Sequence, residues 1–147
     1  MLNSVLLHLE GPAQAESVIR VGVVLAQESA ARLRGLTLLD TRRAEEATQG
    51  EAAIYAVLEH TRQACVEQGQ ETVRECLSHA CLAAGLNFDV RHRSGNPLKV
   101  LPREAQFHDL VITAVCPGGA AHENLSVNLS ASDLMDLLRR GVQPLMV

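Results

Sequence analysis

Two glycines and two serines in the last third of the chain are of residue types that could contact an anion. Gly118 and Gly119 follow the apolar run DLVITAV, and Ser130 and Ser132 precede a stretch with helical spacing. Glycines let backbone amides approach a ligand closely, and the amides at a helix start attract phosphate. A plainer interpretation is also open, in which the glycines form a turn after a buried strand and the serines cap the following helix.

Glu10 is a second candidate, because it ends the first apolar run of the chain, SVLLHLEG. Open parallel sheets bind ligands at the carboxyl ends of their strands, so this carboxylate could lie at the same edge as Gly118 and Gly119. A solvated glutamate at a strand end is also common. Contact with a ligand and a plain surface position are therefore both open for Glu10.

Catalytic and metal-binding patterns are weak elsewhere. Cys76 and His79 lie three residues apart on one predicted helical face, with Cys81 nearby. A closed tetrahedral site needs more ligands than these, and no second cluster in the sequence supplies them, so we predict packed thiols and no metal. The sequence has no Gly-x-Ser-x-Gly elbow, and Lys99, its single lysine, lies in no Walker-type loop. We therefore predict no catalytic residue and no enzyme activity.

Apolar runs that alternate with helical stretches would position these residues. Five short apolar runs predict strands at 4–11, 36–41, 86–93, 109–115 and 143–147. Apolar residues at steps of three and four predict helices at 13–34, 54–84, 98–106 and 133–140, and the polar stretch 41–51 predicts a loop or a frayed helix start. We expect Gly35 to end the first helix, Gly69 to weaken or split the second, and Pro102 to lie in the first turn of the third. This order predicts an α/β domain with an open, five-stranded, mainly parallel sheet and helices on both faces.

Length and composition limit the possible functions. The 147 residues, 47% of them hydrophobic, suit a single domain over 1–147. A net charge of -4, one tyrosine and two phenylalanines disfavour a nucleic-acid partner, which needs clustered cations and stacking rings. No apolar run is long enough for a membrane span, and no signal peptide precedes the four cysteines, so we expect a soluble, cytoplasmic protein. The strand predicted at the chain end is compatible with the first half of a tandem protein.

The order of these elements resembles the universal stress protein family over nearly the whole chain. The matching segments are ARLRGLTLLD, the Gly-Asn-Pro turn at 95–97, DLVIT before a glycine-containing loop, and the closing RRGVQPLMV. The resemblance implies a three-layer fold like that of the adenine nucleotide alpha hydrolases, with ATP or AMP as the ligand to test for. It also implies a homodimer through the final strand, for which PLMV at 144–147 offers an apolar edge.

Members of this family that bind ATP have an acidic residue after the first strand and a phosphate loop after the fourth. Glu10 takes the acidic position here and is followed by Gly11. The family loop reads Gly, two residues, Gly, about nine residues, then Gly and Ser or Thr, whose amides and hydroxyl hold phosphate.

Two alignments of the phosphate loop compete in this sequence. A direct alignment places Ala114 and Pro117 at two glycine positions. With two extra residues at the strand end, Gly119 and Ser130 match the family pattern, and the other glycine positions hold Cys116 and Leu129. A side chain at such a position crowds the backbone approach to the ligand, so the resemblance implies a degenerate nucleotide loop in either alignment.

Three functional hypotheses follow. The first is a non-enzymatic stress-response or regulatory domain that dimerises, binds an unidentified protein partner, and binds nucleotide weakly or not at all. The second is an ATP-binding or AMP-binding protein that would use Glu10, Gly11, Thr41, Gly118, Gly119 and Ser130. The third, a nucleotide-dependent hydrolase or transferase, is the least supported, because no lysine loop stabilises a transferred phosphoryl group.

Overall fold

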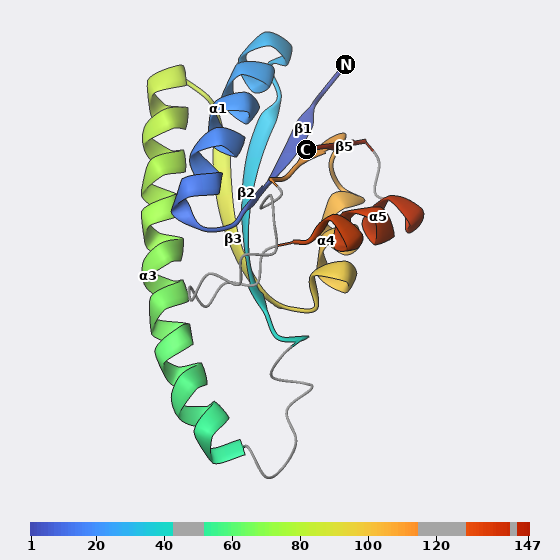
Figure 1. Cartoon of the computed structure of the whole chain (residues 1–147). Helices are drawn as coiled ribbons and strands as arrows, with labels where there is room; N and C mark the ends of the chain where they lie inside the picture. Colours follow the sequence, from blue (N-terminus) through green and yellow to red (C-terminus); the bar gives the residue numbers. More distant parts are fainter. Residues whose placement is uncertain (43–51, 115–128, 142–143) are drawn as a thin grey trace.

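The computed structural model describes residues 1–42, 52–114, 129–141 and 144–147 (Figure 1). The described strands are β1 (Ser4–Leu9), β2 (Arg32–Asp40), β3 (Phe88–Gly95), β4 (Leu110–Ile112) and β5 (Leu145–Met146). The described helices are α1 (Pro12–Ser29), α3 (Ala52–Ala84), α4 (Pro97–Ala105) and α5 (Ala131–Arg139).

The strands form one five-stranded sheet in the order β3-β2-β1-β4-β5. All four pairings are parallel, although β5 contributes only two residues. The chain first moves from β1 outward to β3 and then continues on the other side of β1 with β4. The order therefore reverses between β1 and β4, which is where open α/β sheets leave a crevice at the carboxyl ends of their strands.

Helices cover both faces of the sheet, as the sequence predicts. Figure 1 shows α1 and α3 on one side and α4 and α5 on the other. Val5, Leu7 and Leu9 of β1 pack in the core with α1 and α3, whereas Leu6 joins Leu36 in the core with α4 and α5. Helices cover both faces of β1, so five consecutive residues of this strand are buried. This burial explains why the sequence of the strand is nearly continuously apolar.

The boundary between α1 and β2 differs from the prediction. The helix ends at Ser29 because Ala30 adopts the left-handed conformation (φ 54°), with its N–H donated to the Ala26 carbonyl. The strand then begins at Arg32, so the prediction of a helix to residue 34 that ends at Gly35 is wrong. Gly35 instead lies inside β2, where a Cβ would come within 2.6 Å of a side-chain atom of Leu77 on α3. The glycine lets the long helix pack closely on the sheet.

Other predicted boundaries shift by a few residues. Gly69 does not split α3, which runs without interruption for 33 residues. Pro97 occupies the first turn of α4 and Asn96 caps this helix, so Pro102 lies inside the helix rather than in its first turn. The loop predicted at 41–51 falls mainly outside the described residues. No helix within the described ranges is long and apolar enough to cross a membrane.

Candidate functional site

Four charged side chains meet at the carboxyl edge of the sheet, and we call them the edge cluster: Glu10, Asp40, Arg42 and Asp133. Glu10 directly follows β1, Asp40 is the last residue of β2, and Asp133 lies in the first turn of α5. The strands are parallel, so residues at their carboxyl ends come to one edge even when they are distant in sequence.

Arg42 bridges the end of β2 and the start of α5. Its Nε lies 2.9 Å and its Nη2 lies 2.6 Å from Asp40 Oδ2, and its Nη1 donates to Asp133 Oδ1 at 2.8 Å. Both carboxylates are well shielded, with side chains 3% and 13% exposed. The hydrogen bond to Asp40 is the main cause that holds the pKa of Arg42 above its ordinary value. The guanidinium therefore stays charged and joins two elements 91 residues apart.

Ser130 and Asp133 form a reciprocal cap at the start of α5. The N–H of Asp133 donates to Ser130 Oγ at 3.1 Å, while Asp133 Oδ2 accepts from the N–H and the hydroxyl of Ser130, each at 3.0 Å. Burial would raise the pKa of Asp133, but hydrogen bonds from Arg42 and Ser130 hold it below its ordinary value. Of the two serines considered as caps, Ser130 is the one in place, and its polar donors already meet a carboxylate.

Glu10 is buried rather than solvated, so the surface interpretation of this residue is wrong. Its side chain is 6% exposed, and its Oε1 accepts the N–H of Leu129 at 3.0 Å. Its Oε2 is buried and has no hydrogen-bond partner among the described residues. Burial is the main cause that raises the pKa of Glu10 to about 7; the Leu129 N–H opposes this shift, and the nearby carboxylates of Asp133 and Asp40 add to it.

His8 lies next to Glu10 and contacts Thr113. His8 Nδ1 lies 3.0 Å from Thr113 Oγ1 at the end of β4 and 3.6 Å from Glu10 Oε1. Complete burial lowers the pKa of His8 to about 4, so the imidazole is neutral near pH 7 and makes no ion pair with Glu10. His8 belongs to the buried core, because the residue is 4% exposed.

The remaining predicted site residues are placed only in part. Gly11 caps the N-terminus of α1, and its carbonyl accepts the N–H of Ala15 at 3.0 Å. Thr41 follows β2, and its N–H donates to the Gly95 carbonyl at 3.3 Å. Gly118 and Gly119 lie outside the described residues, so their assignment to a ligand stays a prediction.

Asp40, Arg42 and Thr113 were not identified as site residues from the sequence, nor was the contact of Asp133 with Arg42. One signal was available, since Asp40 ends an apolar run as Glu10 does, and Arg42 follows two residues later. Charged residues that directly follow parallel strands lie at the same carboxyl edge of the sheet, so the sequence positions of Glu10, Asp40 and Arg42 indicate a common site.

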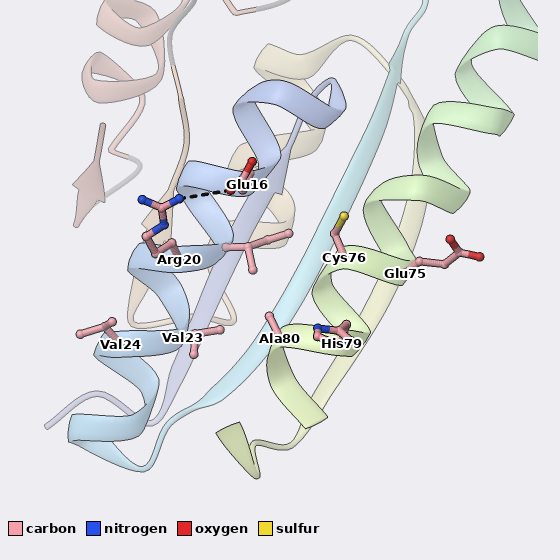
Figure 2. A pocket seen from close by; sticks show the side chains of 9 residues that line it. Glu16, Arg20, Val23, Val24, Glu75, Cys76, His79 and Ala80 are labelled. Carbon is pink, nitrogen blue, oxygen red and sulfur yellow. Dashed lines mark hydrogen bonds and ion pairs between the residues drawn. The ribbon is translucent and has the colours of Figure 1, made fainter. Parts of the chain in front are cut away.

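A hollow of about 610 Å³ lies between α1 and α3, away from the edge cluster (Figure 2). Figure 2 shows the Glu16–Arg20 ion pair on α1, and Cys76 and His79 on the neighbouring helix α3. Cys76 is exposed, whereas burial raises the pKa of the Cys81 thiol to about 11. Within the described ranges, no group of three or more His, Cys, Asp and Glu side chains could hold a metal ion.

Similarity to proteins of known structure is found at the level of the fold. No protein-family model and no curated protein matches the sequence. A universal stress protein from Lactobacillus plantarum is 15% identical, with a TM-score of 0.68 over 99% of this chain and 95% of that one. A universal stress protein from Archaeoglobus fulgidus in complex with dAMP is 12% identical, with a TM-score of 0.57 over 99% and 96% of the two chains. A universal stress protein in complex with cAMP is 19% identical, with a TM-score of 0.58 over 99% and 94%. The chain therefore has the fold of the universal stress proteins.

Proposed function

We propose that this chain is a non-enzymatic regulatory domain of the universal stress protein type, whose phosphate site is filled by its own carboxylates. One observation carries the proposal: the donors at the start of α5 are already bonded to acidic side chains. The N–H of Leu129 donates to Glu10, and the N–H and hydroxyl of Ser130 donate to Asp133. Leu129 and Ser130 are the positions that the family resemblance assigns to phosphate contacts.

The charge of the edge cluster also opposes an anionic ligand. Among the described residues, Arg42 bonds to both Asp40 and Asp133, and Glu10 adds a third carboxyl group. A phosphate charge held about 4 Å from the carboxylate of Asp133 would be repelled by about 4 kcal/mol at the effective dielectric constant of a protein surface. The attraction of the phosphate to Arg42, which lies 2.8 Å from Asp133, offsets part of this repulsion. The full repulsion from Asp133 would weaken binding roughly a thousandfold. Ser130 itself is exposed, so its occupied donors, and not burial, stand in the way of a ligand.

The second candidate function is an adenine-nucleotide binder. Similar structures described as complexes with cAMP and dAMP favour it, and so does the place of Glu10 beside the crevice between β1 and β4. Protonation of Glu10 near neutral pH would remove one negative charge from this crevice. The two candidates differ in whether the carboxylates of the edge cluster keep a nucleotide out.

Calorimetry and thermal unfolding with millimolar ATP, AMP and cAMP in the presence of Mg²⁺ test the proposal. We expect no heat and no shift in Tm for the natural chain. The double variant Glu10→Gln with Asp133→Asn keeps the shape of both side chains and one acceptor oxygen on each but removes two charges, and we expect it to gain affinity. The matched control is Asp136→Asn, which removes a charge from a half-exposed position of the same helix.

Two outcomes would contradict this proposal. Stabilisation of the natural chain by about 2.7 kcal/mol, the value for a ligand at a hundredfold excess over its Kd, would establish nucleotide binding. An equal response of the double variant and the Asp136→Asn control would show that the carboxylates do not exclude the ligand. For the enzyme hypothesis, we expect phosphate release from ATP at the rate of buffer alone.

Association with a partner protein belongs to the same proposal. β5 forms one edge of the sheet, and Met146 and Val147 are 38% and 67% exposed. A homodimer through this strand stays a prediction, as does the cytoplasmic location. The tests above do not depend on either.

A further inference from the structure

The other edge of the sheet, strand β3, is much longer than β5 and is open to solvent. It spans eight residues, Phe88–Gly95, against two in β5, and each of its residues is half-buried or exposed. Figure 1 shows β3 beside β2, and within the described residues no strand pairs with its outer side. An unpaired edge of this length is a template for the addition of another strand.

The hydrogen bonds between β2 and β3 determine which backbone groups point outward. Leu33 donates its N–H to the Asn87 carbonyl at 3.1 Å, and Thr41 donates its N–H to the Gly95 carbonyl at 3.3 Å. The register between these ends is unbroken. In a parallel ladder, alternate residues direct both backbone groups to the same neighbour, so the odd-numbered residues of β3 face β2. The N–H and C=O groups of the even-numbered residues, including Val90, therefore point to the open edge.

The side chains of β3 separate into a charged face and an apolar face. Asp89, Arg91 and Arg93 share the α4 side, where Arg93 Nε lies 2.9 Å from Glu104 Oε1. Phe88 and Val90 lie on the other side and pack against the core formed with α1 and α3. The charged face thus carries an acid and two bases in a fixed order along the edge.

This order permits one favourable antiparallel register between two copies. A two-fold axis can pass through a hydrogen-bonded pair, centred on Phe88, Val90, His92 or Ser94, or through a non-hydrogen-bonded pair. Centres on Asp89, Arg91 or Arg93 place that residue opposite its own symmetry mate, which is repulsive, and a centre on Ser94 pairs only the last residues of the strand. A centre on His92 places Arg91 opposite a second Arg93, which is repulsive. A centre on Phe88 pairs only the first residues of the strand.

A centre on Val90 places Asp89 of each copy opposite Arg91 of the other. The same register faces Val90 with its own symmetry mate and Phe88 with His92. The charged residues then occupy a non-hydrogen-bonded pair, in which side chains lie closest together. Asp89 also accepts from Arg34 Nε of β2 at 2.9 Å, but Asp89 and Arg91 are 48% and 41% exposed, so both remain accessible to a second chain.

We propose that two copies of this chain pair through β3 in this register, with Val90 on the two-fold axis. Three hydrogen-bonded residue pairs, or about six backbone hydrogen bonds, would join the two sheets into one. The contact is closed and isologous, because the same strand serves both copies. It lies at the opposite end of the strand order from β5 and includes no residue of the edge cluster, so it holds whether or not the chain binds nucleotide.

Charge reversal in two separate variants tests the register. In the Arg91→Asp dimer an acid faces an acid at both symmetric sites, and in the Asp89→Arg dimer a base faces a base at both sites. We expect each change to raise the dimer Kd by at least about tenfold in sedimentation equilibrium. An equimolar mixture of the two variants pairs acid with base at both sites, and we expect it to form heterodimers with the affinity of the natural dimer. The control Arg103→Asp makes the same charge change at an exposed position of α4 and should leave the Kd unchanged.

Val90→Pro tests the backbone pairing. Proline removes the N–H that points to the open edge and leaves the ladder with β2 intact, so we expect loss of the dimer with retention of the circular dichroism spectrum. A chain that stays monomeric at several hundred micromolar would overturn the proposal. So would a dimer that tolerates both Arg91→Asp and Val90→Pro but is lost on Met146→Asp, because that dimer would use β5. Failure of the mixed variants to associate would overturn the register.

Discussion

Replacement of Glu10 by Gln should stabilise the protein at alkaline pH. Gln keeps the acceptor for the Leu129 N–H but carries no charge, and the pKa of Glu10 is raised from 4.5 to about 7 in the folded chain. A carboxyl group with a raised folded pKa stabilises the fold below its unfolded pKa and loses that contribution as the pH rises through the folded value. The natural chain therefore loses stability between about pH 4.5 and pH 7, and the variant does not.

The size of this effect follows from the two pKa values. A shift from 4.5 to about 7 corresponds to about 3 kcal/mol in full, since one pKa unit is about 1.4 kcal/mol. We expect Glu10→Gln to be more stable than the natural chain by about 1 kcal/mol at pH 5 and by about 3 kcal/mol at pH 8. His8 contributes equally to both proteins, and its pKa of about 4 keeps it neutral in the fold over this range.

Urea denaturation at pH 5, 6, 7 and 8, followed by circular dichroism, measures the difference in the free energy of unfolding between the two proteins. The reasoning predicts a difference that grows with pH and levels off above about pH 7 to 8. A variant that is less stable than the natural chain at pH 8 would refute it, because the carboxylate would then be a favourable partner in the fold. A difference in the free energy of unfolding that is the same at every pH would refute it as well, because the stability of the natural chain would then not depend on the protonation of Glu10.

Two further substitutions test the packing and the edge cluster by the same assay. Arg42→Ala removes the guanidinium from Asp40, whose side chain is 3% exposed, and should cost about 3 kcal/mol or more at pH 7; a loss below about 0.5 kcal/mol would place the bridge among weak surface pairs. Gly22→Ala brings a Cβ within 2.5 Å of Leu7 Cδ2 in the core and should cost about 1 to 3 kcal/mol. Its control is Gly69→Ala in α3, where no atom lies within 4 Å and about 0.5 to 1 kcal/mol of stabilisation is expected; equal effects at the two glycines would contradict the close approach of α1 to the sheet.

Local sequence pattern predicted most of the architecture. The run SVLLHL is nearly continuously apolar because both of its faces are covered, and this pattern indicates a strand buried on both faces of a parallel sheet. The order of strands and helices then leaves few topologies, and the observed sheet agrees with the predicted one. Local pattern failed at Ala30, because residues 31–34 continue the helical spacing while the backbone has already left the helix. The left-handed turn at an alanine has no signal in composition.

The sequence determined one part of the candidate site, and only the tertiary structure determined the rest. The sequence alone placed Glu10 and Ser130 at the carboxyl edge, because strand ends and helix starts can be read from nearby residues. Only the tertiary structure showed that Glu10 is buried and that Ser130 donates to Asp133, since the partner of Glu10 is an amide 119 residues away. The bridge from Arg42 to Asp133 spans 91 residues in the same way. The charge and occupancy of a site depend on contacts between distant segments, and these form only when the sheet brings the ends of its strands together.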